Sequence, residues 1–358
     1  MKSIYIRPTN IVFGQKANYF IQAETAKSLC GLEDVGFLSV EILKRQTDGN
    51  TVEEYSVLEL EGLDFRNEIE SDLNKITSKR NSIYNLNFRN PILMGVLNVT
   101  PDSFSDGGKY NTTFRAIDHV KSMIDFGAHI IDVGGESTRP GAKSVSEQDE
   151  IADEIARVSE TIQLIKKKYP NQIISLDTRK SKVMQHGLSI GVDMLNDVSA
   201  LDFDPQSYQV VKDSGKPIVL NHSQGIPEDM QNNPTYENVL LDIFDYFENK
   251  IKFLKDNGIK DEQIIIDPGI GFGKTLEHNL EIISKISLFH SLGYPIMVGP
   301  SRKSFIGKIM GEKDNPQRLG GTIASVLYSY LQGIQLFRVH DIQETSEALK
   351  VYSQFLKK

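Results

Sequence analysis

Strong hydrogen-bond acceptors end three short apolar segments of the sequence. Asp177 follows "QIISL", Asn196 lies in "DMLND" and Asp267 ends "QIIID". Two carboxylates and an amide that face a common space suit a flat heterocycle with several N–H donors. We therefore expect a ligand with a nitrogen-rich ring.

Cationic and donor side chains occupy comparable places elsewhere in the chain. Lys303 lies in "GPSRKS", Arg338 and His340 lie in "RVHD", and Arg139 lies in "DVGGESTRPGA". An arginine presents a planar pair of donors to phosphate oxygens, and a lysine acts as a point charge. The two sets together predict a ligand with a polar ring at one end and a phosphate or diphosphate at the other.

Several other chemistries are not supported by the sequence. The segment "GFGK" (271–274) lacks the spacing of a nucleotide phosphate loop. We find neither a cluster of Cys and His with the spacing of a zinc site nor a persuasive Ser-His-Asp arrangement. Any one of the polar residues named above is explained as well by a helix cap or a turn, so only their joint placement indicates a site.

The elements that must position these residues begin at residue 91, where short apolar segments start to alternate with longer amphipathic ones. This alternation favours parallel strands joined by helices. Eight such units in 91–358 match a (β/α)8 TIM barrel of ~250 residues, with a doubly wound sheet as the alternative. The loops after barrel strands carry the chemistry, and polar residues do follow all eight. The predicted strands are 92–97, 129–133, 172–176, 193–197, 217–221, 263–267, 295–299 and 334–339, and the predicted helices include 114–127, 147–168, 236–258 and 278–293.

Residues 1–90 form a different region, which we predict to be a small N-terminal α/β extension of unknown role. Short strand-like segments alternate there with possible helices near 20–30 and 66–79. The charged, turn-rich stretch 77–91 has the composition of a linker. No catalytic constellation precedes Pro91, so the chemistry is expected in a second domain, residues 91–358.

Composition bounds the class of protein. The chain has 358 residues with 48 acidic and 40 basic side chains, a net charge of -8 that argues against general nucleic-acid binding. Its single cysteine, Cys30, allows no internal disulfide. The N-terminus is a poor signal peptide, and no stretch approaches the ~18 apolar residues of a membrane helix. We expect a cytoplasmic enzyme that does not bind membranes.

Seven motifs in order carry a family resemblance: "LNVTPDSFSDGG", "DVGGESTRPGA", "SLDTRK", "NDVSA", "IDPGIGFGK", "SRKSFIG" and "FRVHD". With them, residues 91–358 closely resemble the dihydropteroate synthase family of folate biosynthesis. The resemblance implies a transferase that joins a dihydropterin carrying a CH₂-diphosphate to p-aminobenzoate and releases diphosphate. It also implies Mg²⁺ as a cofactor, a homodimer, and a site that sulfonamides target.

The resemblance implies a role for each matching residue. Asp177, Asn196, Asp267 and Lys303 would hold the pterin, and Asp177, Asp267, Lys303 and Arg139 would act in catalysis. The diphosphate would be bound by Asn98, Thr138, Arg139, Arg338 and His340, with Asn98 also near the Mg²⁺. The p-aminobenzoate site would be shaped by Phe104, Thr138, Pro140, Phe272 and Ser304.

Two departures from the family pattern stand out. Asn221 and Ser223 replace methionines that usually follow the fifth strand, and the first of those methionines packs on the pterin face. Pro300 replaces an aliphatic residue. Two alternatives therefore stay open: a pterin-binding methyltransferase that moves a methyl group from a folate to a corrinoid protein, and a non-catalytic pterin-binding homologue. Residues 1–90 are short for an active pterin pyrophosphokinase, because a full domain needs ~150 residues. A dimerisation module, a degenerate partner enzyme and a structural cap remain possible for them.

Overall fold

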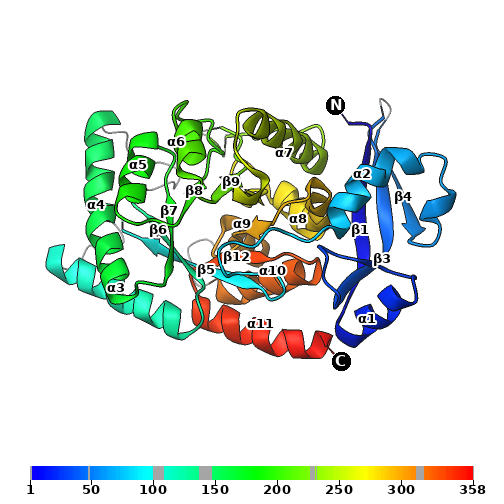
Figure 1. Cartoon of the computed structure of the whole chain (residues 1–358), viewed down its shortest axis with the longest axis horizontal. Helices are drawn as coiled ribbons and strands as arrows, with labels where there is room; N and C mark the ends of the chain where they lie inside the picture. Colours follow the sequence, from blue (N-terminus) through cyan, green and yellow to red (C-terminus); the bar gives the residue numbers. More distant parts are fainter. Residues whose placement is uncertain are drawn as a thin grey trace.

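The computed structural model describes residues 2–46, 49–99, 109–136, 147–225, 230, 232–311 and 318–357. Two sheets organise the chain (Figure 1), and their strands are not hydrogen-bonded to one another. The N-terminal sheet is antiparallel and comprises β1 (Ile4–Phe13), β2 (Lys27–Ser28), β3 (Val35–Lys44) and β4 (Thr51–Ser56). Its helices are α1 (Gly14–Gln22), η1 (Leu60–Gly62) and α2 (Arg66–Thr77).

The second sheet confirms the predicted barrel. Its eight strands are all parallel, in the order β10-β9-β8-β7-β6-β5-β12-β11. A parallel bridge between Ile266 and Ile296 joins β10 to the residue before β11, so the two ends of the sheet meet. The strands are β5 (Ile92–Asn98), β6 (Ile130–Gly134), β7 (Ile173–Asp177), β8 (Met194–Asp197), β9 (Ile218–Asn221), β10 (Ile264–Asp267), β11 (Met297–Val298) and β12 (Leu336–Val339).

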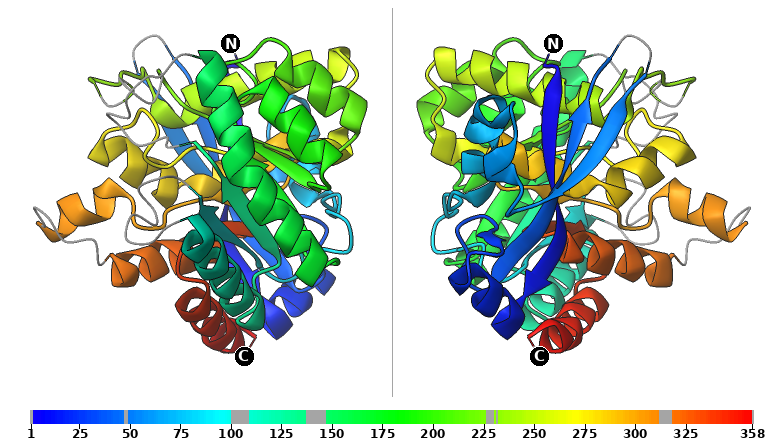
Figure 2. Two further views of the ribbon diagram at one scale, coloured as in Figure 1. Left: turned by 90° about the vertical axis from the view of Figure 1, so that its left-hand side faces the viewer. Right: turned by 90° about the vertical axis from the view of Figure 1, so that its right-hand side faces the viewer.

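Helices surround the barrel (Figure 2). Each predicted barrel helix corresponds to an observed one, except that 278–293 divides into an α-helix and a 3-10 helix because the chain turns at Lys285. In the N-terminal region the possible helix near 20–30 is wrong: α1 ends at Gln22, the chain turns at Glu24 with a φ of 58°, and β2 follows at Lys27–Ser28. The outer helices are α3 (Lys109–Asp125), α4 (Glu147–Lys168), α5 (Ser181–Ser189), α6 (Ser207–Ser214), α7 (Val239–Asp256), η3 (Asp261–Gln263), α8 (Leu276–Ser284), η4 (Ile286–Leu292), α9 (Ser304–Met310), α10 (Leu319–Leu331) and α11 (Ile342–Leu356).

The barrel interior changes from apolar to polar along the strands. An apolar cluster contains Met94, Ile130, Met194, Val219, Ile265, Met297 and Leu336, one residue from each of seven strands, and partly buried Ile173 of the eighth strand packs against it. Side chains two residues further along a strand point to the same side. Those positions hold Val96, Asp132, Ser175, Asn196, Asn221, Asp267, Gly299 and Arg338. The polar layer therefore lies at the carboxyl ends of the strands, where barrel enzymes place their sites.

The stretch 77–91 packs against the barrel and is more than a linker. Ile83 and Phe88 are buried and belong to the same cluster as the apolar barrel layer. A short antiparallel bridge between Ile83 and Leu86 shapes the turn. These side chains therefore cover the end of the barrel opposite the polar layer.

The N-terminal sheet packs on the outside of the barrel (Figures 1 and 2). Tyr5 of β1 is fully buried and meets Phe244 of α7 edge-on, with ring centroids 5.3 Å apart. Arg45 binds Asp242 and Asp245 of the same helix. In the part of the chain that the structure describes, no helix is both long and apolar enough to cross a membrane.

Candidate active site

The residues predicted to bind a ligand meet at the carboxyl ends of the barrel strands. Strand register places Asn98 beside Gly134, Gly134 beside Asp177, and Asp177 beside Asn196. On the neighbouring strands, Asn221 pairs in register with Asp267. Parallel register and the barrel's closure thus bring together side chains that are far apart in the sequence.

Arg338 joins three strands at the centre of this end. Its Nε donates to Asp132 Oδ2 at 2.6 Å, and its Nη2 donates to Asp177 Oδ2 at 2.7 Å. The Asn196 amide also donates to Asp132 Oδ2, at 3.1 Å. Since an arginine holds its donors in one plane, these contacts fix the guanidinium between β6 and β7.

Asp177 and Asp267, the two acids predicted for the site, both have pKa values above the ordinary value of an aspartate. Burial raises the pKa of Asp177 to about 7, and Asp132 adds to the rise while Arg338 opposes it. Burial also raises the pKa of Asp267 to about 6. A hydrogen bond of 2.7 Å from the Gly269 amide, together with Lys303 and Arg338, holds the pKa of Asp267 from rising further.

Lys303 lies at the N-terminal end of α9, in the loop after β11, the strand that neighbours β10 and its Asp267 in the closed ring. Burial, followed by repulsion from Arg338, lowers the pKa of Lys303 to about 8. Its Nζ lies 3.7 Å from the centre of the Phe272 ring, a cation–π contact. Gly271 permits this approach, because a Cβ there would lie 3.0 Å from Lys303 Cδ. Ser304, the next residue, is exposed at the start of α9.

His340 is neutral at physiological pH. Burial and the charges of Arg338 and Arg302 lower its pKa to about 3. Its backbone N–H donates to Ser301 Oγ at 3.2 Å, and Ser301 Oγ lies 3.0 Å from His340 Nδ1. This contact holds the ring in place, and in the tautomer with its proton on Nε2 the neutral imidazole is a donor for an anion.

Four predicted residues, Phe104, Thr138, Arg139 and Pro140, lie outside the described residues. The start of their motif is described. Glu136 is bound by Arg179 at 2.9 Å and by Lys180 at 2.8 Å. Lys180 also binds Glu154 of α4 at 2.8 Å, so one buried lysine links the residues on both sides of 137–146.

Sequence reasoning missed Asp132, although it opens one of the motifs. Its side chain is fully buried and accepts hydrogen bonds from Arg338 and Asn196, while its Oδ1 has no partner. The available indication was its place in "HIIDV", two residues after an inward-facing isoleucine. Lys274 and His222, buried behind Asp267, were also not predicted as site residues.

The donor atoms near Asn98 bear on the predicted Mg²⁺ site. Among the described residues, no three His, Cys, Asp or Glu side chains are grouped so as to hold a metal ion. A Cβ on Gly134 would lie 3.5 Å from Asn98 Oδ1 and 3.7 Å from Asp177 Oδ2. Both oxygens lie near Gly134, and Asp177 Oδ2 already accepts a hydrogen bond from Arg338 at 2.7 Å. The amide oxygen of Asn98 is a ligand type that Mg²⁺ accepts, so Asn98 fits the predicted ion as one ligand, with the other ligands coming from substrate and water.

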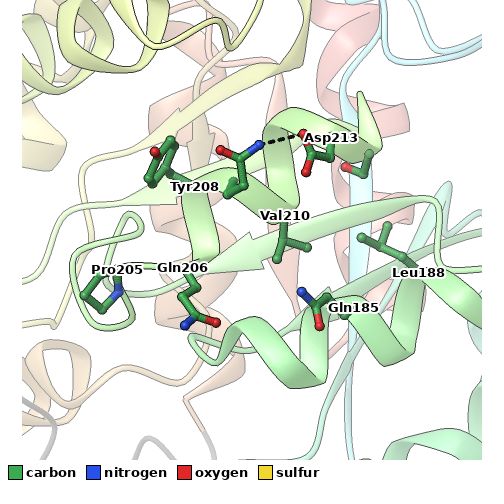
Figure 3. A pocket seen from close by; sticks show the side chains of 9 residues that line it. Gln185, Leu188, Pro205, Gln206, Tyr208, Val210 and Asp213 are labelled. Carbon is green, nitrogen blue, oxygen red and sulfur yellow. Dashed lines mark hydrogen bonds between the residues drawn. The ribbon is translucent and has the colours of Figure 1, made fainter.

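A separate groove lies on the outer helices (Figure 3). It is lined from α5 by Gln185 and Leu188, and from Pro205 to Ser214 mainly by α6. Gln209 donates to Asp213 within it at 2.6 Å. The residues that line the groove include no cluster of acids and cations like the one at the barrel mouth. The mouth is therefore the candidate active site.

Fold and site together define a (β/α)8 barrel whose mouth brings buried acids and cations together. The family model described as "Pterin binding enzyme" matches residues 94–340. The dihydropteroate synthase of Escherichia coli is 40% identical over 266 residues, 74% of this chain and 92% of that protein. The enzyme of Clostridium beijerinckii is 43% identical over 260 residues, 72% of this chain and 92% of that one.

Solved structures agree. Dihydropteroate synthase from Yersinia pestis, in a sulfonamide complex, superposes with a TM-score of 0.69 at 38% identity, covering 75% of this chain and 95% of that one. The Xanthomonas albilineans enzyme with 4-aminobenzoic acid gives 0.69 at 36% identity, covering 75% and 94%. The chain belongs to the dihydropteroate synthase family of pterin-binding enzymes, transferases of folate biosynthesis. These matches favour the synthase over the methyltransferase and non-catalytic alternatives.

Proposed function

We propose that the barrel mouth condenses (7,8-dihydropterin-6-yl)methyl diphosphate with p-aminobenzoate to give 7,8-dihydropteroate and diphosphate. The observation that carries this proposal is the meeting of Asp177, Asp267, Lys303 and Arg338 at one end of the barrel. One small molecule reaches all four side chains there. The substrates are small molecules, and the net charge gives no reason to invoke nucleic acid.

The pterin ring is assigned to the polar layer. Asp177 and Asp267 accept hydrogen bonds from the ring's amino and N–H groups, while the Asn196 amide contributes both a donor and an acceptor. Lys303 donates to the ring's remaining polar atoms from its place over Phe272. Asn221, which donates to the Val198 carbonyl at 3.0 Å, gives this wall a polar atom.

The diphosphate is assigned to the cationic side. Arg338 supplies positive charge, and His340 donates an N–H without carrying charge of its own. Asn98, Thr138 and Arg139 complete this set by family resemblance. Asn98 Oδ1 would hold the Mg²⁺ together with diphosphate oxygens, and the ion would offset charge that grows on the leaving group.

Bond cleavage precedes bond formation in the reaction. The C–O electrons leave with the diphosphate, and the pterin ring and the Asp177 and Asp267 carboxylates stabilise the resulting cation. The amine nitrogen of p-aminobenzoate then attacks the CH₂ carbon and loses a proton to solvent water. No covalent enzyme intermediate is required, because stabilising the charge that develops in the transition state lowers the barrier directly.

The p-aminobenzoate is assigned to the outer rim of the mouth. Phe272 provides an aromatic wall beside Lys303, and exposed Ser304 lies within reach of solvent. Phe104, Thr138 and Pro140 are assigned to the same subsite. Sulfonamides resemble p-aminobenzoate in shape, so this rim is also where they would compete.

The barrel at 91–358 is assigned the whole of substrate binding, and 1–90 a structural role as a cap. A homodimer in the cytoplasm is the proposed state. The strongly apolar helix α10 supports the dimer, because only Thr322, Val326 and Ser329 of its described side chains are buried. Tyr328 of α10 is 48% exposed and Ile309 of α9 is 57% exposed, which leaves an apolar face for a second copy.

The reaction is tested by measuring diphosphate release with the purified full chain. Release should require both the pterin diphosphate and p-aminobenzoate, and dihydropteroate should form in equal amount. Removal of Mg²⁺ by a chelator should abolish turnover. Diphosphate release without p-aminobenzoate, or methyl transfer from a folate, would contradict the proposal.

A further inference from the structure

Three glycines with left-handed backbone build the loop after β10. Gly269, Gly271 and Gly273 have φ angles of 71°, 81° and 60°. A Cβ on Gly269 would lie 1.9 Å from the carbonyl oxygen of His222, and one on Gly273 would lie 2.3 Å from that of Gln224. The loop therefore lies directly against the loop that follows β9, with no room for a side chain between them.

The side chain of Lys274 connects these two loops. The residue is only 2% exposed. Its Nζ donates to the carbonyl oxygens of Phe272 and His222, at 2.9 and 3.2 Å, and lies 3.1 Å from His222 Nδ1. An ammonium has three donors, so each finds one acceptor. Burial and the charge of Lys274 lower the pKa of His222 far below its ordinary value, which keeps Nδ1 an acceptor.

All three of these acceptors are neutral, so none of them cancels the charge of Lys274. The acid on which this charge acts is Asp267. Burial lowers the pKa of Lys274 to about 7; attraction to Asp267 opposes this fall, and repulsion from Lys303 adds to it. Lys274 in turn favours the ionised form of Asp267. The chain also connects them, since the His222 amide donates to the Asp267 carbonyl oxygen at 2.9 Å.

We propose that Lys274 is a positioning residue for the pterin end of the site: its buried ammonium ties the loops after β9 and β10 together and keeps a positive charge near Asp267. The proposal rests on the function assigned above. Lys274 is buried and touches no substrate. It acts through Phe272, whose ring supports Lys303, and through Asp267, which must be ionised to accept hydrogen bonds from the ring.

Three substitutions of Lys274 distinguish the effect of its hydrogen bonds between the two loops from the effect of its positive charge. K274R keeps the charge. K274Q keeps an amide that donates to the two carbonyl groups but removes the charge, and K274M removes both. Binding of the pterin diphosphate is measured by calorimetry between pH 5 and pH 9, and the thermal unfolding of each variant is recorded alongside.

The pH dependence of binding should report the charge. Asp267 also faces Lys303, Arg338 and the Gly269 amide, and these are the same in every variant. Without the Lys274 charge, the pKa of Asp267 rises, so the acid limb of K274Q binding should move up by about one pH unit. Binding should weaken about fivefold at pH 6 and approach the wild-type value near pH 8. K274M should bind more weakly than K274Q at every pH, and K274R should keep the wild-type limb.

The outcomes are distinct. A folded K274Q protein with the wild-type acid limb and affinity would overturn the role of Lys274. K274Q decides this even when K274M fails to fold, because the amide keeps the carbonyl groups satisfied. Failure of the wild-type chain to bind the pterin diphosphate at any pH would instead overturn the proposed function.

Discussion

At the scale of single residues, Asp132 is the acid on which the polar layer depends. Its Oδ2 accepts from Arg338 and Asn196, and its Oδ1 has no partner. An asparagine can place its oxygen at the first position and its NH₂ at the second. We predict that D132N folds but loses about 10- to 100-fold in kcat/KM for the pterin diphosphate, because Arg338 loses one counter-charge. Steady-state kinetics measures this loss.

The truncation D132A is the matched control for packing. It leaves part of a buried guanidinium without its carboxylate, which should reduce the free energy of unfolding by about 3 kcal/mol. Urea denaturation measures this value. If D132N kept the kcat/KM of the wild-type enzyme, the charge of Asp132 would have no part in the site.

The pH dependence of the reaction also belongs to single residues. Asp177 and Asp267 must be ionised and Lys303 protonated in the free enzyme; the pKa values of the two acids are about 7 and about 6, and that of the lysine is about 8. We predict a bell-shaped kcat/KM for the pterin diphosphate, with an acid limb set by the two aspartates and a maximum between the pKa values of Asp177 and Lys303. The K303R enzyme should lose the alkaline limb, because arginine stays protonated. A flat profile from pH 5.5 to pH 9 would contradict these assignments.

The sequence predicted much of this layer because acids and cations at strand ends are unusual. Asp177, Asn196, Asp267, Lys303, Arg338 and His340 meet at one mouth, as the motifs implied. Asp132 was missed because it lies inside an apolar strand, where its inward direction depends on barrel register. The sequence also did not predict that Gly269, Gly271 and Gly273 adopt left-handed backbone conformations, which let the loop after β10 pack against the loop after β9.

At the scale of elements, Lys180 clamps the segment that leaves β6. It binds Glu136 just after the strand and Glu154 on α4, and all three side chains are buried. Breaking a buried ion pair costs about 3–5 kcal/mol, so K180M should lower the free energy of unfolding by that amount. The control is K121M, which removes the exposed Lys121–Asp125 pair of α3 and should leave stability unchanged. Equal unfolding midpoints for the two variants would refute the clamp.

Elements were predictable where burial leaves a strong pattern. The eight strands are short apolar segments, and α4 begins and ends where its periodicity predicted. The helices α5, α6 and α9 were not singled out because seven to nine residues give little periodicity. The strand at 295–299 is observed only as Met297–Val298, because its place in the ring needs just two paired residues.

At the scale of the whole molecule, the N-terminal region is packed as part of one body with the barrel. Cys30 receives a hydrogen bond from Gln335, beside β12, and lies 3.5 Å from His290 Nδ1 of η4. Leu331 of α10 and Leu356 of α11 pack into the core of the N-terminal sheet. Such contacts were invisible in the sequence, since residues 1–90 carry no motif and their partners lie hundreds of positions away.

Two truncations test whether this region is a structural cap. Residues 78–358 keep Ile83 and Phe88 over the end of the barrel, whereas 91–358 remove them as well. Burying one such side chain contributes about 1.5–3 kcal/mol, so thermal stability should fall in two steps, first with the sheet and again with 78–90. Both truncated chains should also expose the α7 surface that Tyr5 and Arg45 cover, and should aggregate more readily than the full chain. If 91–358 unfolded at the same temperature as the full chain and kept its kcat/KM, the first ninety residues would have to serve something other than the barrel's stability.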